Sequence, residues 1–272
     1  MEIAVNAVLT IVGLVILCLG GNWLVSGGVA IAKKLRISQM IIGLTIVAYG
    51  TSTPELAASM AAIVGSHTDL ILGNIVGSNI SNIGMVIGVC AVISPLVVKK
   101  ATTRKEVPIM IGVSLLLIAI SVDGEISQLD GVMLVAGLIA FTVYTLSRAK
   151  KEREKATEDS SITKTPVPRA LVLIVIGAAL LYFGGFLTVE NAVLIAENLG
   201  ISETVIGITI IAIGTSLPEL ITSIIAIRKG HMDIGIGTIV GSNIYNILMI
   251  LGISSVITGI AVVPGMFTDY LV

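Results

Sequence analysis

Long apolar stretches recur along the whole chain and are separated by short polar connections. Most of the stretches reach about 20 residues, the length that an α-helix needs to cross the hydrocarbon core of a bilayer. Two of them are interrupted near the middle by glycine, hydroxyl residues and proline. The pattern predicts eight spanning helices, over residues 4–32, 38–64, 70–95, 107–122, 130–148, 169–198, 202–227 and 233–258.

Composition agrees with this pattern. Of the 272 residues, 55% are hydrophobic and 12% are charged, whereas a soluble domain carries about 25% charged residues. The chain is therefore predicted to be an all-α, polytopic membrane protein rather than a water-soluble globule. Cys18 and Cys90 lie in apolar stretches and are expected to be buried free thiols, without a disulfide framework or metal-binding spacing.

Basic residues mark one side of the predicted membrane protein. All 16 Lys and Arg lie at 33–36, 99–105, 148–169 and 228–229, which are alternate connections between the predicted helices. The positive-inside rule then places the N-terminus outside the cell and the 148–168 connection in the cytoplasm. We expect a multi-pass protein of the plasma membrane.

Two short phrases occur twice at one fixed offset. Gly-Thr-Ser-x-Pro-Glu ends at Glu55 and at Glu219, and Gly-Ser-Asn-Ile-x-Asn ends at Asn82 and at Asn246, so both phrases repeat after 164 positions. Five predicted helices separate equivalent points, and an odd number gives the two copies opposite orientations. This is an inverted-topology repeat, a common plan of transporters whose site lies near the bilayer midplane.

The offset also divides the chain. We expect a first repeat over 1–147, a cytoplasmic linker over 148–168 and a second repeat over 169–272. Each repeat should contain five helices, but the chain stops where the partner of the fourth would begin. The last two of an expected ten helices are thus absent, through either a C-terminal truncation or a natural eight-helix form.

Glu55 and Glu219 are the only acids deep inside predicted spans. A carboxyl group there costs several kcal/mol unless it is paired, protonated or wetted, so it is a functional candidate. For a single Glu, the alternative is a structural role in which the protonated side chain bridges two helices. Two glutamates in identical sequence contexts favour a functional role.

Each Glu follows a predicted helix break. Pro54 and Pro218 lack the N–H that would continue the helix, and we expect free carbonyls near the break. An ordinary kinked helix is the alternative, but hydroxyl groups stand beside the expected carbonyls. The predicted carbonyls belong to Val47, Ala48, Ile211 and Ala212, and the hydroxyls to Thr51, Ser52, Thr215 and Ser216.

The second phrase adds further oxygens. Ser78 and Asn82 are four residues apart and share one helical face, as do Ser242 and Asn246. Asn79 and Asn243 point elsewhere and are expected to bond helix to helix. His67 and His231 fall in loops, where we expect them to be solvated.

Carboxylate, carbonyl, hydroxyl and amide oxygens are the ligands of hard cations. The pooled site has a fixed charge of about −2, which one Ca²⁺ or two Na⁺ would neutralise. A site that must be filled before it crosses the membrane favours antiport over a channel, although the selectivity does not follow from the charge.

At these two phrases the chain resembles the sodium/calcium exchanger family of the cation/calcium antiporter superfamily, over residues 20–94 and 184–258. The short linker resembles that of the compact prokaryotic exchangers. The resemblance implies a ten-helix fold whose first and sixth helices are long, tilted and slide against the rest. It also implies that Glu55 and Glu219 are the central ligands of both ions.

The resemblance implies a role for each remaining candidate as well. Side chains would bind Na⁺ at Thr51, Ser52, Thr215, Ser216, Ser78 and Ser242, carbonyls would contribute at Ala48 and Ala212, and Asn82 and Asn246 would complete the ring. Relatives often carry Asp at one of the last two positions. Two Asn argue against K⁺ dependence and against a proton-coupled role there.

Three other functions compete with this one. The first is a Ca²⁺/H⁺ antiporter of the same superfamily, or an antiporter of another divalent cation and H⁺. The Ca²⁺/H⁺ antiporters have G-N-[AV]-x-E instead, and the hydroxyls here favour Na⁺. An intramembrane hydrolase would need a close carboxyl dyad or His-Glu-x-x-His, and neither motif is present. A purely structural role would not require a Glu in both copies. We therefore predict no enzyme and no cofactor, with Na⁺ and Ca²⁺ as substrates, the lipid bilayer as partner, and no nucleic-acid or protein partner.

Overall fold

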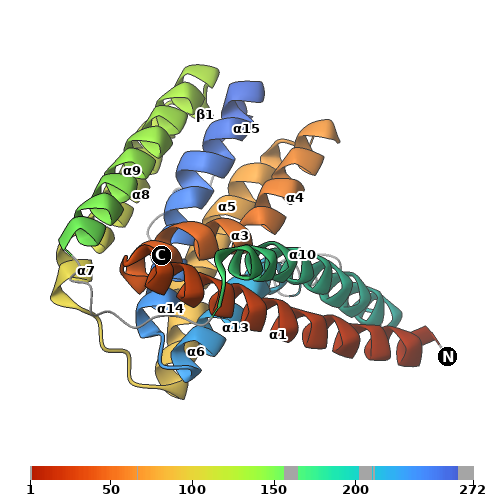
Figure 1. Ribbon diagram of the computed structural model, residues 1–272. Helices are drawn as coiled ribbons and strands as arrows, with labels where there is room; N and C mark the ends of the chain where they lie inside the picture. The colour runs from red at the N-terminus through yellow and green to blue at the C-terminus, as the bar shows by residue number, and fades with distance from the viewer. Residues whose placement is uncertain (1, 66, 156–164, 202–209, 211, 263–272) are drawn as a thin grey trace.

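The computed structural model describes residues 2–65, 67–155, 165–201, 210 and 212–262. Their fold is almost entirely helical (Figure 1). The elements of the first half are α1 (Glu2–Leu35), α2 (Gln39–Ile42), η1 (Gly43–Val47), α3 (Ala48–Thr51), α4 (Thr53–Val64), α5 (Asp69–Ser81), η2 (Asn82–Val86), α6 (Ile87–Ile93), α7 (Lys100–Arg104), α8 (Glu106–Ile120), β1 (Glu125–Ile126) and α9 (Gln128–Lys155). Those of the second half are α10 (Val167–Asn198), α12 (Ala212–Thr215), α13 (Leu217–Arg228), α14 (Met232–Tyr245), η4 (Asn246–Leu251), α15 (Gly252–Ile257) and β2 (Ile260–Ala261).

Within the described ranges, five helical segments are long and apolar enough to cross a membrane, which confirms the predicted class. They are Glu2–Leu35, Leu70–Ile93, Gln128–Lys155, Val167–Asn198 and Met232–Ile257. The predicted span over 107–122 is the shorter helix α8. The span over 38–64 is divided into four pieces, and much of the span over 202–227 lies outside the described residues.

The long helices α1 and α10 lie side by side and cross the direction of α9, α15 and α4 (Figure 1). A Cβ atom built on Gly13 would lie 2.9 Å from the Gly184 carbonyl oxygen, and one on Gly20 would lie 2.8 Å from that of Gly177. The residue number of the contact rises along α1 while it falls along α10, so the two helices are antiparallel. Gly13 and Gly177 are equivalent under the 164-residue offset, and so are Gly20 and Gly184. The pair therefore has the two-fold relation expected of an inverted repeat.

The third helix of the second repeat is the most central part of the structure. In an 18-residue apolar window of Met232–Ile257, 94% of the residues are buried, whereas the share in the corresponding window of its counterpart Leu70–Ile93 is 33%. Gly237 and Gly241 let α14 approach the backbone of η1, as predicted for small residues at helix contacts. The centre of the fold therefore holds the second copy of the Gly-Ser-Asn phrase.

Several features differ from the sequence-based expectation. The fifth helix does not end near 148 but continues to Lys155, and its last turns contain the i,i+4 ion pairs Arg148–Glu152 and Lys150–Glu154. Residues 156–164 of the predicted linker and 263–272 lie outside the described residues. Cys90 is buried as expected, but Cys18 is exposed on α1. A two-residue strand pair, β1 with β2, was not predicted.

In the described part of the chain, π-helical segments that include η1, η2 and η4 interrupt the α-helices, and they were also not predicted. η2 begins at Asn82 and η4 begins at Asn246. π-Helical turns are rare in proteins, and those that occur are often found at functional sites. Their position at equivalent asparagines of both repeats shows that the wider turn belongs to the repeated phrase.

Candidate cation site

Both predicted helix breaks are present. Ser52 and Ser216 adopt φ,ψ of −84°,6° and −88°,2°, which lie off the helical minimum. The chain re-enters a helix at Thr53 and at Leu217 with proline as the next residue, where its missing N–H is not needed. Each glutamate therefore stands in the first turn of a new helix, where unpaired N–H groups and the helix dipole favour negative charge.

The second break lies against the first. The Ser52 hydroxyl donates to Glu219 Oε1 at 3.3 Å, and the Ser242 hydroxyl donates to the same oxygen at 3.2 Å. Ser52 belongs to the first repeat and Glu219 to the second. The carboxylate of one copy is thus held by hydroxyls from both.

Two further hydroxyl pairs join the repeats symmetrically. Thr51 Oγ1 lies 3.3 Å from Ser242 Oγ, and Thr215 Oγ1 lies 3.4 Å from Ser78 Oγ. Thr51 and Thr215 are equivalent under the 164-residue offset, as are Ser78 and Ser242. The structure therefore brings together hydroxyls that the sequence placed in four separate segments.

The asparagines form a layer beside these hydroxyls. Asn246 donates its amide to Asn79 Oδ1 at 3.0 Å, and Asn79 donates its own amide to the Asn243 carbonyl oxygen at 3.4 Å. The prediction that Asn79 bonds helix to helix is confirmed. The Asn243 side chain instead donates to Ile239 within its own helix, at 2.7 Å. Asn79 was not among the predicted site residues, although its place in the repeated phrase was the available signal.

The predicted side chains are buried almost without exception. Glu55 and Glu219 each expose 1% of their surface, and Thr215 is the only one of the predicted site side chains in the described part of the chain that is half-buried. The buried polar side chains include Thr51, Ser52, Ser78, Asn82, Ser216, Ser242 and Asn246. None of the ion pairs formed by the described residues involves either glutamate.

Five of the predicted site residues have a buried side-chain oxygen without a hydrogen-bond partner. These oxygens are Glu55 Oε2, Asn82 Oδ1, Ser216 Oγ, Glu219 Oε2 and Asn246 Oδ1, and other such oxygens occur elsewhere in the fold, as at Glu106 and Thr222. Leaving a buried acceptor unsatisfied costs about 1–3 kcal/mol, and more for a charged group. Oxygen lone pairs are what a hard cation requires. The donor set therefore suits a cation better than a hydrogen-bonded core.

The backbone carbonyls correspond less well to the prediction. The Ala48 carbonyl is not freed by Pro54, because it accepts the Ser52 N–H at 2.9 Å and the Thr51 hydroxyl at 3.2 Å. The carbonyl one turn before Pro54 is that of Gly50. Ala212 begins α12, and the predicted carbonyl of Ile211 lies outside the described residues.

A cavity of about 360 Å³ extends from the second break between α4 and α10. Pro54, Pro218 and Thr215 line one part of it, and Tyr182 and the exposed Glu190 line another. Thr215, Tyr182 and Glu190 are its polar lining residues, and the rest of its lining is apolar.

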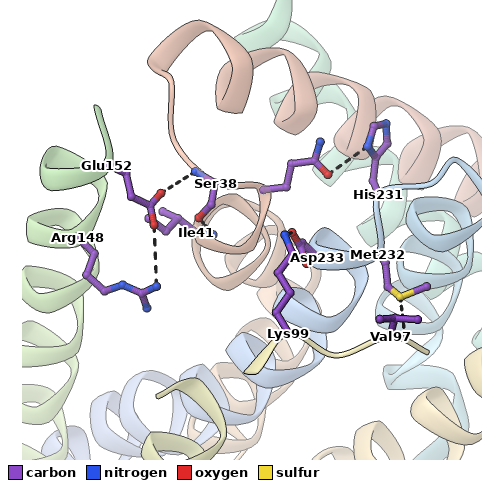
Figure 2. Close-up of polar contacts among 10 residues, drawn as sticks. Ser38, Ile41, Val97, Lys99, Arg148, Glu152, His231, Met232 and Asp233 are labelled. Atoms are coloured by element: carbon purple, nitrogen blue, oxygen red, sulfur yellow. Dashed lines mark hydrogen bonds and ion pairs between the residues drawn. The ribbon is translucent and has the colours of Figure 1, made fainter. Parts of the chain in front are cut away.

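Figure 2 shows polar contacts of residues that do not belong to the candidate site. Glu152 accepts the Ser38 N–H at 2.8 Å, and Arg148 pairs with Glu106. His231, which was expected to be solvated, lies 3.2 Å from Gln39 Oε1. In the described part of the chain, no group of three or more His, Cys, Asp and Glu side chains is placed to hold a metal ion. The candidate site thus depends on two carboxylates and neutral oxygens.

Comparison with known proteins identifies the family of the chain. The sequence profile of the family described as sodium/calcium exchanger protein matches residues 5–147 and 169–270. The putative antiporter CaxA of Alkalimonas amylolytica is 42% identical, with 93% of this chain and 81% of that protein covered. The sodium/calcium exchanger MaX1 of Methanosarcina acetivorans is 33% identical, with 93% and 83% covered. A solved structure of the sodium-calcium exchanger NCX_Mj, soaked with 100 mM Na⁺ and 10 mM Sr²⁺, is 33% identical and superposes with a TM-score of 0.84 over 99% of this chain and 88% of that one.

Proposed function

Since the chain belongs to the sodium/calcium exchanger protein family, we propose that it exchanges Na⁺ for Ca²⁺ across the membrane at the buried oxygen site between its repeats. The chain is a multi-pass membrane transporter. Relatives named as a sodium/calcium exchanger and a putative antiporter support this choice of ions and of antiport.

The observation that carries the proposal is the set of buried oxygens without partners. Both glutamates and both phrase-ending asparagines contribute one such oxygen, and Ser216 contributes another. They come from both repeats, so a cation bound among them would contact both. Ligands from both repeats are what alternating access requires, because the bound ion must stay held while one repeat moves against the other.

The charge of the site supports exchange rather than uniport. Two buried carboxylates need about two positive charges, which one Ca²⁺ or two Na⁺ would supply. The neutral hydroxyls and amides would complete the shells of either ion. An empty site would leave two carboxylates unpaired in a low-dielectric environment. The alternating-access transition of the empty site is therefore disfavoured, and this couples the transport of the two ions.

The roles follow from this arrangement. Glu55 and Glu219 act as the central ligands. The hydroxyls and the two phrase-ending asparagines complete the coordination shells of the bound ions. We place the protein in the plasma membrane with its N-terminus outside, the arrangement that the positive-inside rule favours.

The proposal is tested by ⁴⁵Ca²⁺ uptake into proteoliposomes loaded with Na⁺ and diluted into Na⁺-free buffer. We expect uptake that collapses when the Na⁺ gradient is removed. A parallel set of liposomes carries only a pH gradient. Uptake driven by the pH gradient alone would replace the Na⁺ proposal with a Ca²⁺/H⁺ antiporter.

A further inference from the structure

An apolar groove of about 580 Å³ lies between α1 and α13, separate from the cation site. Its walls are apolar side chains and one thiol, from Ile11, Leu14, Val15, Cys18, Leu19 and Ile225. Its volume falls within the range of about 300–1,000 Å³ that small-molecule sites occupy. The groove faces the region where a bilayer would surround the protein.

One end of the groove is basic and polar. Arg228, the last residue of α13, and Lys229 line this end with Asn22 of α1. The Lys229 ammonium donates to Asn22 Oδ1, and to Ser26 Oγ at 3.1 Å. These bonds hold the exposed ammonium at the end of the groove.

These two cations have no acidic partner. None of the ion pairs among the residues that the structure describes includes Arg228 or Lys229, and both are exposed. Partial burial lowers the pKa of Lys229, because desolvation disfavours the charged ammonium. An anion beside it would offset that cost.

The dimensions of the groove match half of a bilayer. Ile11 and Asn22 are 11 positions apart on one helix, which corresponds to about 16 Å at 1.5 Å per residue. This is about half of the 30 Å hydrocarbon thickness. A lipid whose headgroup lies at Arg228 would extend its chain along α1 to about the midplane.

We propose that this groove binds one anionic glycerophospholipid, with its phosphate on Arg228 and Lys229 and one acyl chain along α1. Charge complementarity selects the headgroup, and the apolar walls select the chain. The site would hold a lipid between one long helix of the α1/α10 pair and the helix that carries Glu219.

The single tryptophan, Trp23, follows Asn22 and is half-buried, so it reports on this end of the groove. The protein is reconstituted in phosphatidylcholine with increasing 6,7-dibromo phosphatidylglycerol or 6,7-dibromo phosphatidylcholine, and quenching of tryptophan fluorescence is measured. Each basic residue near a membrane contributes about 1 kcal/mol to binding an anionic lipid, so we expect brominated phosphatidylglycerol to quench at about 5- to 30-fold lower mole fraction.

Two variants make the test specific. Arg228→Gln/Lys229→Gln should abolish the preference for phosphatidylglycerol, while the control Arg104→Gln/Lys105→Gln, with the same charge change away from the groove, should keep it. Cys18→Phe, which adds bulk inside the groove, should reduce quenching by the anionic lipid.

Three outcomes would overturn the proposal. The first is a wild-type protein with no preference, whether both lipids quench equally or neither does. The second is a preference that persists in Arg228→Gln/Lys229→Gln. The third is unchanged quenching in Cys18→Phe, which would place the chain elsewhere.

Discussion

The Ser52 hydroxyl donates a hydrogen bond to Glu219 Oε1 across the interface between the repeats, at 3.3 Å. The equivalent serine of the second repeat, Ser216, has a buried hydroxyl with no partner. The two halves therefore hold their carboxylates differently. An inverted repeat needs such asymmetry, because the two repeats exchange conformations when the transporter turns to the other side of the membrane.

Glu55→Gln and Glu219→Gln should each abolish exchange. A unit charge at about 4 Å contributes about 4 kcal/mol at an effective dielectric constant of 20, so the loss should be about 1,000-fold. Na⁺-driven ⁴⁵Ca²⁺ uptake measures it. Glu154→Gln, the same change at an exposed position near the end of α9, serves as the control. Full transport in both site variants would refute the site assignment.

Asn79→Ala should raise the KM for Ca²⁺ with a smaller effect on the maximal rate. Asn79 accepts the Asn246 amide, which leaves Asn246 Oδ1 free as an acceptor, and loss of one such bond costs about 1 kcal/mol or about fivefold. Asn243→Ala is the matched variant, because its amide bonds only to its own helix. Equal changes in KM would show that Asn79 does not position Asn246.

Gly20→Ala should destabilise the α1/α10 pair. A Cβ atom there would lie 2.8 Å from both the Gly177 carbonyl oxygen and the Leu181 nitrogen, so two backbones must separate, at a cost of about 1–3 kcal/mol. Thermal unfolding in detergent measures the difference. Gly112→Ala in α8, where no described atom lies within 4 Å, should instead stabilise by up to about 1 kcal/mol. The prediction fails if both variants shift the unfolding temperature alike.

His231 should make the fold sensitive to acid. Burial and the nearby Lys33 and Lys229 lower the pKa of His231 below its ordinary value of 6.5. The unfolded chain then binds a proton more readily, so stability is full above pH 6.5 and falls as the pH drops through the lower folded pKa. Unfolding temperatures from pH 8 to pH 5 should fall less in His231→Gln than in the parent. His67→Gln provides the comparison, and equal acid sensitivity of all three proteins would contradict this role.

Much of the fold was predictable because the relevant signals are local. The spacing of apolar residues marked the long helices, and the repeated proline marked breaks that occur at Ser52 and Ser216. The π-helical turns that begin at Asn82 and Asn246 had no such signal, since their residues also fit an ordinary helix. The extension of α9 to Lys155 is not predictable from the local sequence, because its polar residues are also typical of a linker and Arg148 pairs with the distant Glu106.

By itself, the sequence determined that this protein spans a membrane, that it contains two oppositely oriented copies of one unit, and that each copy carries a carboxylate beside hydroxyls and amides. Hydrophobic length and motif offset suffice for those conclusions. Only the tertiary structure decided which oxygens meet, as in Ser52 with Glu219 and Asn79 with Asn246, each 167 positions apart. Helical hydrogen bonds join residues about four positions apart, so the local sequence determines them. Contacts between repeats depend on how whole helices pack, and that packing also left one oxygen of each carboxylate without a partner.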